Sequence, residues 1–220
     1  MTRRGDRILR WALLAVTAVM AMVVHVPRVL AFPYVGQFGS TAVLAEQPIE
    51  PARMRAVLGR ADALVSASPL ARPGLSRTIV LTDGGWRWRL LSLTSSGAFA
   101  VRRPFGHALV FNRSNIAADA VFNRAPIGNR RTLSGTIAHE TTHILVAEHF
   151  GEWRVPFFPT WKTEGYPDFV ARESSLSPSD AAKLRARDPG ARALIYFDAR
   201  RRVAATLAAN RGSVDALFDQ

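Results

Sequence analysis

The pattern of hydrophobic and polar positions predicts one helix and a few short strands in the first part of the chain. After Pro51, apolar residues recur at helical spacing, at Met54, Val57, Leu58, Ala61, Leu64 and Val65. Residues 32–50 are rich in Gly, Pro and small side chains and predict an entry segment with one short strand. Runs of β-branched or alternating residues predict three further strands, at 77–82, 97–102 and 107–112.

The second part of the chain predicts helices only. Residues 132–150 have the length and composition of a helix that Gly151 can end. Ser177 followed by Pro178 is typical of a helix start, with Ser as the N-cap. Three more helices are expected, from about Glu164, over about 191–210, and after Gly212. A helix and a small mixed sheet followed by helices define an α+β fold.

The N-terminus carries a hydrophobic segment. Residues 11–24 are uninterrupted apolar residues, and the stretch from Ile8 to Val26 is just long enough to span a bilayer. Arginines precede the segment, which places the N-terminus in the cytoplasm and the rest of the chain outside. We therefore divide the chain into a signal-anchor or signal peptide, 1–28, and a domain, 29–220. The alternative to an anchor is a cleaved signal peptide, with Val29-Leu30-Ala31 as the cleavage site.

Composition narrows the classes of function. The chain has 220 residues, 48% of them hydrophobic, and no cysteine, so a metal could be bound only by histidine and carboxylate. The net charge of +12 comes almost entirely from arginine. Nucleic-acid binding is not expected, because the only basic run in the domain is the Arg200–Arg202 triplet and no nucleic-acid motif is present.

Residues 138–150, AHETTHILVAEHF, contain the HExxH motif. His139 and His143 are four residues apart and share one face of a helix, so both imidazoles can bind one ion. Glu140 is rotated by about 100° and can take a proton from water that the metal activates. The motif predicts zinc, and a catalytic zinc needs a third protein ligand. The alternative is a helix with two surface histidines and no metal.

His149 is the nearest candidate for the third ligand. Its spacing is that of the metzincin peptidases, HExxHxxGxxH, but Val146 stands where that glycine turns the chain. A continuing helix rotates His149 by about 240° from His143, away from the site. Metzincins also carry a methionine turn downstream, and the last methionine here is Met54. We expect His149 to be an ordinary histidine in the last turn of the helix.

Residues 159–171, PTWKTEGYPDFVA, resemble the corresponding segment of gluzincins, the thermolysin-like branch of zinc peptidases. The resemblance implies that Glu164, separated from His143 by twenty intervening residues, is the third zinc ligand. It also implies that Asp168 accepts a hydrogen bond from a ligand histidine and fixes its orientation. Taken alone, Glu164 also fits an acid at a helix N-terminus and Asp168 a surface residue. Pro167 departs from the family pattern and would kink a helix that began earlier.

The resemblance extends to uncharacterised bacterial membrane-tethered proteins with a peptidase-MA-like domain. It rests on the N-terminal segment, Pro33-Tyr34…Phe38-Gly39, RTLSGTIAHETTH, WKTEG and the segment from Tyr196 to Gly212. It implies a zincin-like fold and a bacterial inner-membrane protein with an extracytoplasmic (periplasmic) catalytic domain; the alternative is a soluble exported protein. In gluzincins a Tyr or His after the third ligand stabilises the oxyanion, which leaves Tyr166 and Tyr196. Tyr166 points away from Glu164 on a helix, so we expect Tyr196; its alternative role is a core aromatic.

These residues predict a zinc hydrolase, a peptidase that acts on a peptide or protein substrate. The substrate is expected to pair with an edge strand, for which residues 107–114 are the candidate. The aromatic segment 152–161 is either core or a wall of the substrate site. The rival interpretations are a membrane-tethered binding or assembly module with a zincin-like fold, and a hydrolase of another amide-containing envelope component. The sequence identifies no protein partner.

Overall fold

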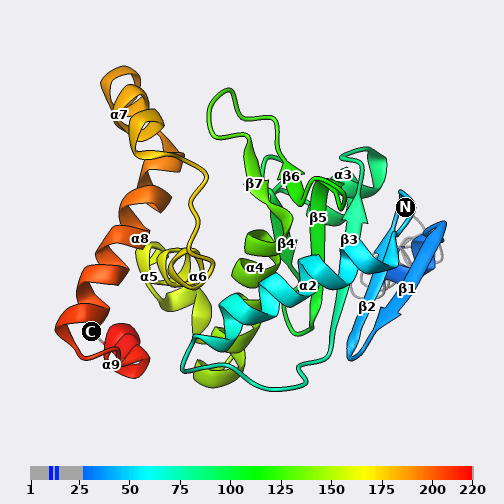
Figure 1. Ribbon diagram of the computed structural model, residues 1–220, viewed down its shortest axis with the longest axis horizontal. Coiled ribbons are helices and arrows are strands. Elements are labelled where there is room, and N and C mark those ends of the chain that lie inside the picture. The colour runs from blue at the N-terminus through cyan, green and yellow to red at the C-terminus, as the bar shows by residue number, and fades with distance from the viewer. Residues whose placement is uncertain (1–9, 12, 15–26, 220) are drawn as a thin grey trace.

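The computed structural model describes residues 10–11, 13–14 and 27–219 (Figure 1). Its strands are β1 (Tyr34–Phe38), β2 (Thr41–Ala45), β3 (Arg77–Thr82), β4 (Ala100–Arg102), β5 (Ala108–Asn115), β6 (Ala120–Phe122) and β7 (Arg130–Thr132). Its α-helices are α2 (Pro51–Ser66), α3 (Trp86–Ser92), α4 (Leu133–Phe150), α5 (Thr160–Thr163), α6 (Gly165–Val170), α7 (Pro178–Arg187), α8 (Arg192–Ala209) and α9 (Val214–Asp219). Two 3₁₀ turns are η1 (Pro27–Leu30) and η2 (Val155–Phe157).

The strands of the described residues form one mixed sheet in the order β1-β2-β3-β5-β6-β7. β2, β3 and β5 run parallel, and β1, β6 and β7 join antiparallel to their neighbours. β4 lies beside the first part of β5, antiparallel to it, and β6 lies beside the last part of β5 on the same side. β4 pairs with no other described strand, so one of its edges is free.

Helices cover both faces of this sheet. α2 and α4 pack on one face, where Met54 and Val57 of α2 meet Ile137 and Ile144 of α4 in the main core. The other face is covered by α3 and the segment after η1, through a smaller cluster around Phe32, Trp88 and Leu91. α4 is therefore held between the sheet and the rest of the protein, and nearly all of it is buried.

The C-terminal helices form a second packed unit against the end of α4, on the left in Figure 1. α6 and α8 pack closely, because Gly165 has no side chain: a Cβ there would stand 2.7 Å from the carbonyl oxygen of Ala199. Tyr166, Val203 and Leu217 fill the core of this unit with the C-terminal residues of α4. The unit thus fixes the position of the chain between α5 and α6 relative to α4.

The α+β class and most of the predicted elements are confirmed. The predicted helices at 51–65, 132–150 and 191–210 correspond to α2, α4 and α8, and Ser177 caps α7 as expected. The entry segment contains two strands rather than one, because β1 and β2 form a tight hairpin. α3, β6 and β7 were not predicted; each is seven residues or shorter, too short for a periodic signal.

The predicted N-terminal hydrophobic segment lies almost entirely outside the described residues. Within the part of the chain that the structure describes, no helix is long and apolar enough to cross a membrane.

Candidate metal centre

α4 carries the HExxH motif, and its first turn is fixed by two segments. Thr132 caps the helix by accepting a hydrogen bond from the Gly135 N–H at 3.0 Å. Glu173, which follows α6, accepts hydrogen bonds from the backbone N–H of Thr132 at 2.8 Å and from its hydroxyl at 2.6 Å. The helix that bears the two histidines is thereby tied to the segment after Asp168.

His139, His143 and Glu164 come together at one point, with Glu164 in the joint between α5 and α6. The Nε2 atoms of His139 and His143 are 3.1 Å apart. Oε2 of Glu164 lies 3.6 Å from Nε2 of His139 and 3.9 Å from Nε2 of His143. Among the described residues this is the group of His and carboxylate side chains with metal-ligand geometry.

The spacing of these atoms fits zinc. In a tetrahedral site with ligands at 2.0–2.2 Å, two ligand atoms stand about 3.3–3.6 Å apart. The three observed separations, 3.1 to 3.9 Å, bracket this range. The donor set of two imidazoles and one carboxylate is also the set that a catalytic zinc uses when a fourth position stays open.

His139 is oriented by a buried chain of polar contacts. Its Nδ1 lies 2.7 Å from Oδ1 of Asp168, so Nδ1–H donates to the carboxylate and Nε2 is left to face the metal position. Nη1 of Arg131 lies 2.9 Å from the same Asp168 oxygen, and both side chains are buried. Pro167 stands in the first turn of α6, which begins at Gly165. The helix therefore has no kink between Glu164 and Asp168 of the kind that Pro167 would cause if the helix began earlier.

The two histidines differ in their pKa values. Burial lowers the pKa of His143 to about 4, so its imidazole is neutral at physiological pH. Burial also acts to lower the pKa of His139, but the carboxylates of Asp168 and Glu164 outweigh it and raise that pKa to about 10. The pKa values of Glu164 and Asp168 are lowered despite burial, Glu164 by the two histidines and Asp168 by Arg131 and His139.

Glu140 lies beside this centre and is almost completely buried. Burial raises the pKa of its carboxyl to about 7, with the charge of Glu164 acting in the same direction. The positive charges of His139, Arg131 and Arg102 oppose the shift. A carboxyl with a pKa near 7 can exchange a proton at neutral pH, as a general base must.

The two candidate tyrosines have different surroundings. Tyr166 is fully buried, and its hydroxyl lies 2.6 Å from that of Ser68, so it is a core residue. Tyr196 on α8 is half-buried and close enough to Glu164 that the carboxylate, after burial, raises the pKa of its hydroxyl. Nε of Arg192 donates to this hydroxyl at 2.6 Å. Of the two, Tyr196 is therefore the tyrosine whose hydroxyl is affected by the charge of Glu164.

His149 is directed elsewhere. α4 continues through Val146 to Phe150 without a turn, and Nε2 of His149 lies 2.6 Å from Oδ1 of Asp215 on α9. His149 is not among the clustered ligands.

The prediction that residues 107–114 form an edge strand able to pair with a substrate was wrong. These residues form most of β5, which pairs with β3 along one edge and with β4 and β6 along the other, so no continuous edge is free for a substrate. The sequence could not show which strands pair with β5. β4 itself has only three residues and occupies part of the predicted strand at 97–102. In segment 152–161, Phe158 and Trp161 pack on the core, which confirms that role for part of the segment, whereas Trp153 is exposed.

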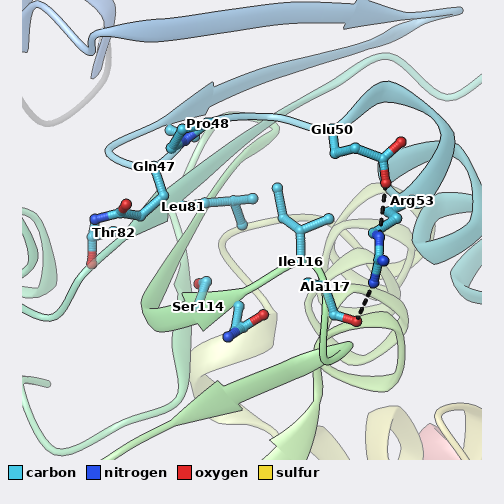
Figure 2. A pocket seen from close by; sticks show the side chains of 11 residues that line it. Gln47, Pro48, Glu50, Arg53, Leu81, Thr82, Ser114, Ile116 and Ala117 are labelled. Carbon is cyan, nitrogen blue, oxygen red and sulfur yellow. Dashed lines mark hydrogen bonds and ion pairs between the residues drawn. The ribbon is translucent and has the colours of Figure 1, made fainter.

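A cavity of about 480 Å³ lies away from the metal centre, at the ends of β2, β3 and β5 beside the start of α2. Figure 2 shows Arg53 in its wall, bonded to Glu50 at 2.9 Å and to the carbonyl of Ala117 at 3.2 Å. Because none of its lining residues belongs to the candidate metal centre, we assign it no role.

Sequence reasoning missed three arginines around the centre. Arg131 lies beneath Asp168, Arg102 affects the pKa values of Glu140 and His143, and Arg192 bonds to Tyr196. Arg131 comes just before the helix start and Arg192 one turn before Tyr196, but in a chain with 27 arginines such positions carry no signal.

Comparison with known proteins gave no match: no protein-family model, no curated protein and no solved structure is similar to the chain.

Proposed function

We propose that the protein is a zinc-dependent hydrolase of the gluzincin type, a peptidase with His139, His143 and Glu164 as metal ligands. The observation that carries the proposal is the set of three ligand atoms 3.1 to 3.9 Å apart, with the buried carboxyl of Glu140 beside them. A structural zinc site would need no such carboxyl, and would normally be closed by a fourth protein ligand.

Zinc at this centre would supply Lewis acidity, activating a water and polarising a substrate carbonyl. Glu140 accepts the proton of the attacking water and delivers it to the leaving nitrogen as the C–N bond breaks, so that one water is consumed for each bond cleaved. Its pKa in the metal-free protein is about 7. Asp168 keeps the proton of His139 on Nδ1, so that Nε2 remains available as a ligand.

Tyr196 is the proposed donor to the oxyanion that forms on the substrate carbonyl. Its hydroxyl accepts from Arg192, which leaves the hydroxyl proton free to donate toward the centre. The positive charge of Arg192 acts to lower the pKa of this hydroxyl, against the effects of burial and of Glu164. Arg192 is therefore proposed as the residue that positions Tyr196.

The substrate backbone is proposed to pair with β4 in place of β5. β4 has a free edge among the described strands, packs on α4, and ends at Arg102, whose charge reaches Glu140 and His143. A peptide added to this edge would lie beside the metal centre. Segment 1–28 would hold the domain at the outer face of the inner membrane, or be removed after export.

The test is metal content and Glu140-dependent hydrolysis. The purified protein should retain about one zinc per chain after dialysis, and should cleave peptides from a mixed library. Glu140→Gln should keep the zinc and lose at least a thousandfold in turnover, because the base is gone and the ligands remain. A wild-type protein that retains no zinc would disprove the proposal. Retained zinc without Glu140-dependent cleavage would instead support the binding module.

A further inference from the structure

Two exposed aromatic rings, Phe105 and Trp153, contact each other at the surface in a tilted arrangement; we call them the aromatic pair. Phe105 lies in the loop between β4 and β5, and Trp153 follows the end of α4. Phe105 is 58% exposed and Trp153 is 76% exposed, although their ring centroids are only 4.6 Å apart. Neighbouring aromatic rings that remain open to water are typical of a surface that binds an apolar group.

The protein holds this pair in place. Glu152 accepts two hydrogen bonds from Arg102, at 3.0 and 2.5 Å, and a third from the backbone N–H of Phe105. These bonds tie the β4–β5 loop to the turn after α4. Phe105 also has a φ of 55°, a left-handed conformation that is unusual for a bulky residue and costs free energy. Glycine at this position would avoid the cost. The presence of Phe despite the strained backbone indicates that its exposed ring has a role.

The aromatic pair lies where the free edge of β4 ends. Arg102 is the last residue of β4, contacts Glu152, and is near enough to the centre to influence the pKa values of Glu140 and His143. Gly151, at the end of α4, is eight residues beyond His143, or about 12 Å along the helix axis. An extended chain covers this distance in about four residues.

We call the free edge of β4, together with the segment that continues from it to the aromatic pair, the track; the charge of Arg102, at the end of this edge, is paired. The guanidinium of Arg102 makes a bidentate ion pair with Glu152, and both side chains are largely buried. A substrate segment on this track therefore meets backbone hydrogen-bonding groups first and an apolar surface at the end.

We propose that the aromatic pair binds an apolar side chain, aromatic by preference, of an extended peptide segment, about four residues from the bond that is cleaved. This inference rests on the proposed function and specifies its substrate class: unstructured protein segments or peptides of at least five residues. Dipeptides and tripeptides are too short to reach from the centre to the pair.

The test separates recognition from turnover. Fluorescently labelled decapeptides of Ala and Ser, with one Phe placed in turn at each position, are titrated into the full-length, zinc-loaded Glu140→Gln protein, and Kd is measured by anisotropy. The same unlabelled peptides are given to the enzyme with intact Glu140 to measure kcat/KM. The variants are Trp153→Ala and Phe105→Ala. Phe157→Ala is the control, since this ring is 86% exposed on the same connection but forms no ring contact with the pair.

Peptides with Phe at one favoured register should bind roughly tenfold more tightly than the Ala/Ser peptide. Trp153→Ala and Phe105→Ala should abolish that preference and leave the Ala/Ser peptide unchanged, whereas Phe157→Ala should preserve it. The exposed positions make loss of folding unexpected, and an unchanged Tm verifies this.

Other outcomes distinguish the two proposals. Glu140-dependent cleavage without any preference for Phe overturns this inference and leaves the proposed function standing. If the peptides bind with a preference for Phe that depends on Trp153 but are not cleaved, the recognition site stands and the proposed peptidase function is overturned. Absence of peptide binding overturns the inference. The inference is also overturned if Trp153→Ala and Phe105→Ala reduce only the sedimentation of the protein with phosphatidylserine vesicles. That result would make the aromatic pair a membrane contact.

Discussion

At the scale of single residues, the centre combines groups that are unfavourable for folding. Glu140 is a carboxyl in an almost fully buried position, and its pKa is raised because the charged form loses its hydration. A residue chosen for stability alone would be neutral here. Its presence in the middle of a buried helix is therefore best explained by a function that needs a carboxylate.

Glu140→Gln should stabilise the metal-free protein at alkaline pH. The folded-state pKa of about 7 exceeds the ordinary value of 4.5, so between these values the folded protein binds more protons than the unfolded chain, and stability falls as pH rises. At pH 8 the substitution should raise the free energy of unfolding by up to about 3 kcal/mol, and at pH 4 by little. Urea denaturation of chelator-treated protein at both values measures this.

Glu148→Gln provides the control, because Glu148 lies on the same helix but pairs with Arg72 and His107 at the surface. It should change stability by less than about 1 kcal/mol, with no comparable gain on going from pH 4 to pH 8. An equal effect of Glu140→Gln at both pH values would contradict the assignment of a raised pKa.

Arg131→Met should both destabilise the protein and weaken zinc binding. It leaves the carboxylate of Asp168 buried without its cation, which typically costs about 3–5 kcal/mol. Because Asp168 orients His139, zinc affinity should fall about 10–100-fold. Arg131→Lys keeps a charge and should lose less. Arg130→Met, at the exposed neighbouring position of β7, should change neither quantity appreciably; equal effects at both positions would contradict the role of Arg131.

At the scale of secondary-structure elements, sequence predicts what a single helix can encode. The spacing of His139 and His143, the end of α4 at Gly151 and the cap of α7 at Ser177 depend on local geometry, and all are observed as expected. The approach of Glu164 to the histidines was implied by resemblance, and depends in the structure on the packing of α6 against α4 and α8.

The remaining features depend on contacts between distant segments. Arg131 acquires its position from Asp168, and the free edge of β4 results from the way β5 is shared between β4 and β6. The pattern of hydrophobic and polar residues within one segment does not indicate which distant segment it contacts. This is why the strand that pairs with the substrate was predicted wrongly.

Two glycines in helices should respond in opposite ways to replacement by alanine. Gly59 is exposed in α2, and an added Cβ meets nothing within 4 Å, so Gly59→Ala should stabilise the protein by about 0.5–1 kcal/mol. At Gly135 a Cβ would stand 2.2 Å from Oε2 of Glu173 and 2.6 Å from Oγ1 of Thr132. Gly135→Ala should therefore break the contacts that fix the start of α4 and lower Tm. A gain in Tm for both variants would contradict this account of the helix start.

At the scale of the whole molecule, the candidate metal centre lies between two packed units. His139 and His143 lie on α4, which packs on the sheet, whereas Glu164 and Asp168 belong to the segment held by α8 and α9. A metal bound by all three ligands would therefore link the two units. Its loss should loosen the joint between α5 and α6 more than the sheet.

Zinc should consequently stabilise the entire fold, and the effect should depend on Glu164 and not on His149. At a free zinc concentration 100 times Kd, linkage raises the free energy of unfolding by about 2.7 kcal/mol, so chelation should lower Tm by several degrees. Hydrogen exchange should increase most in residues 159–171 when the metal is removed. Glu164→Ala should abolish the zinc-dependent rise in Tm, because a ligand is lost. His149→Ala should retain it, because among the described residues the polar and ring contacts of that side chain are with Asp215 and Phe150, neither of which is a proposed ligand. If His149→Ala abolished the zinc effect and Glu164→Ala did not, the assignment of the third ligand would be wrong.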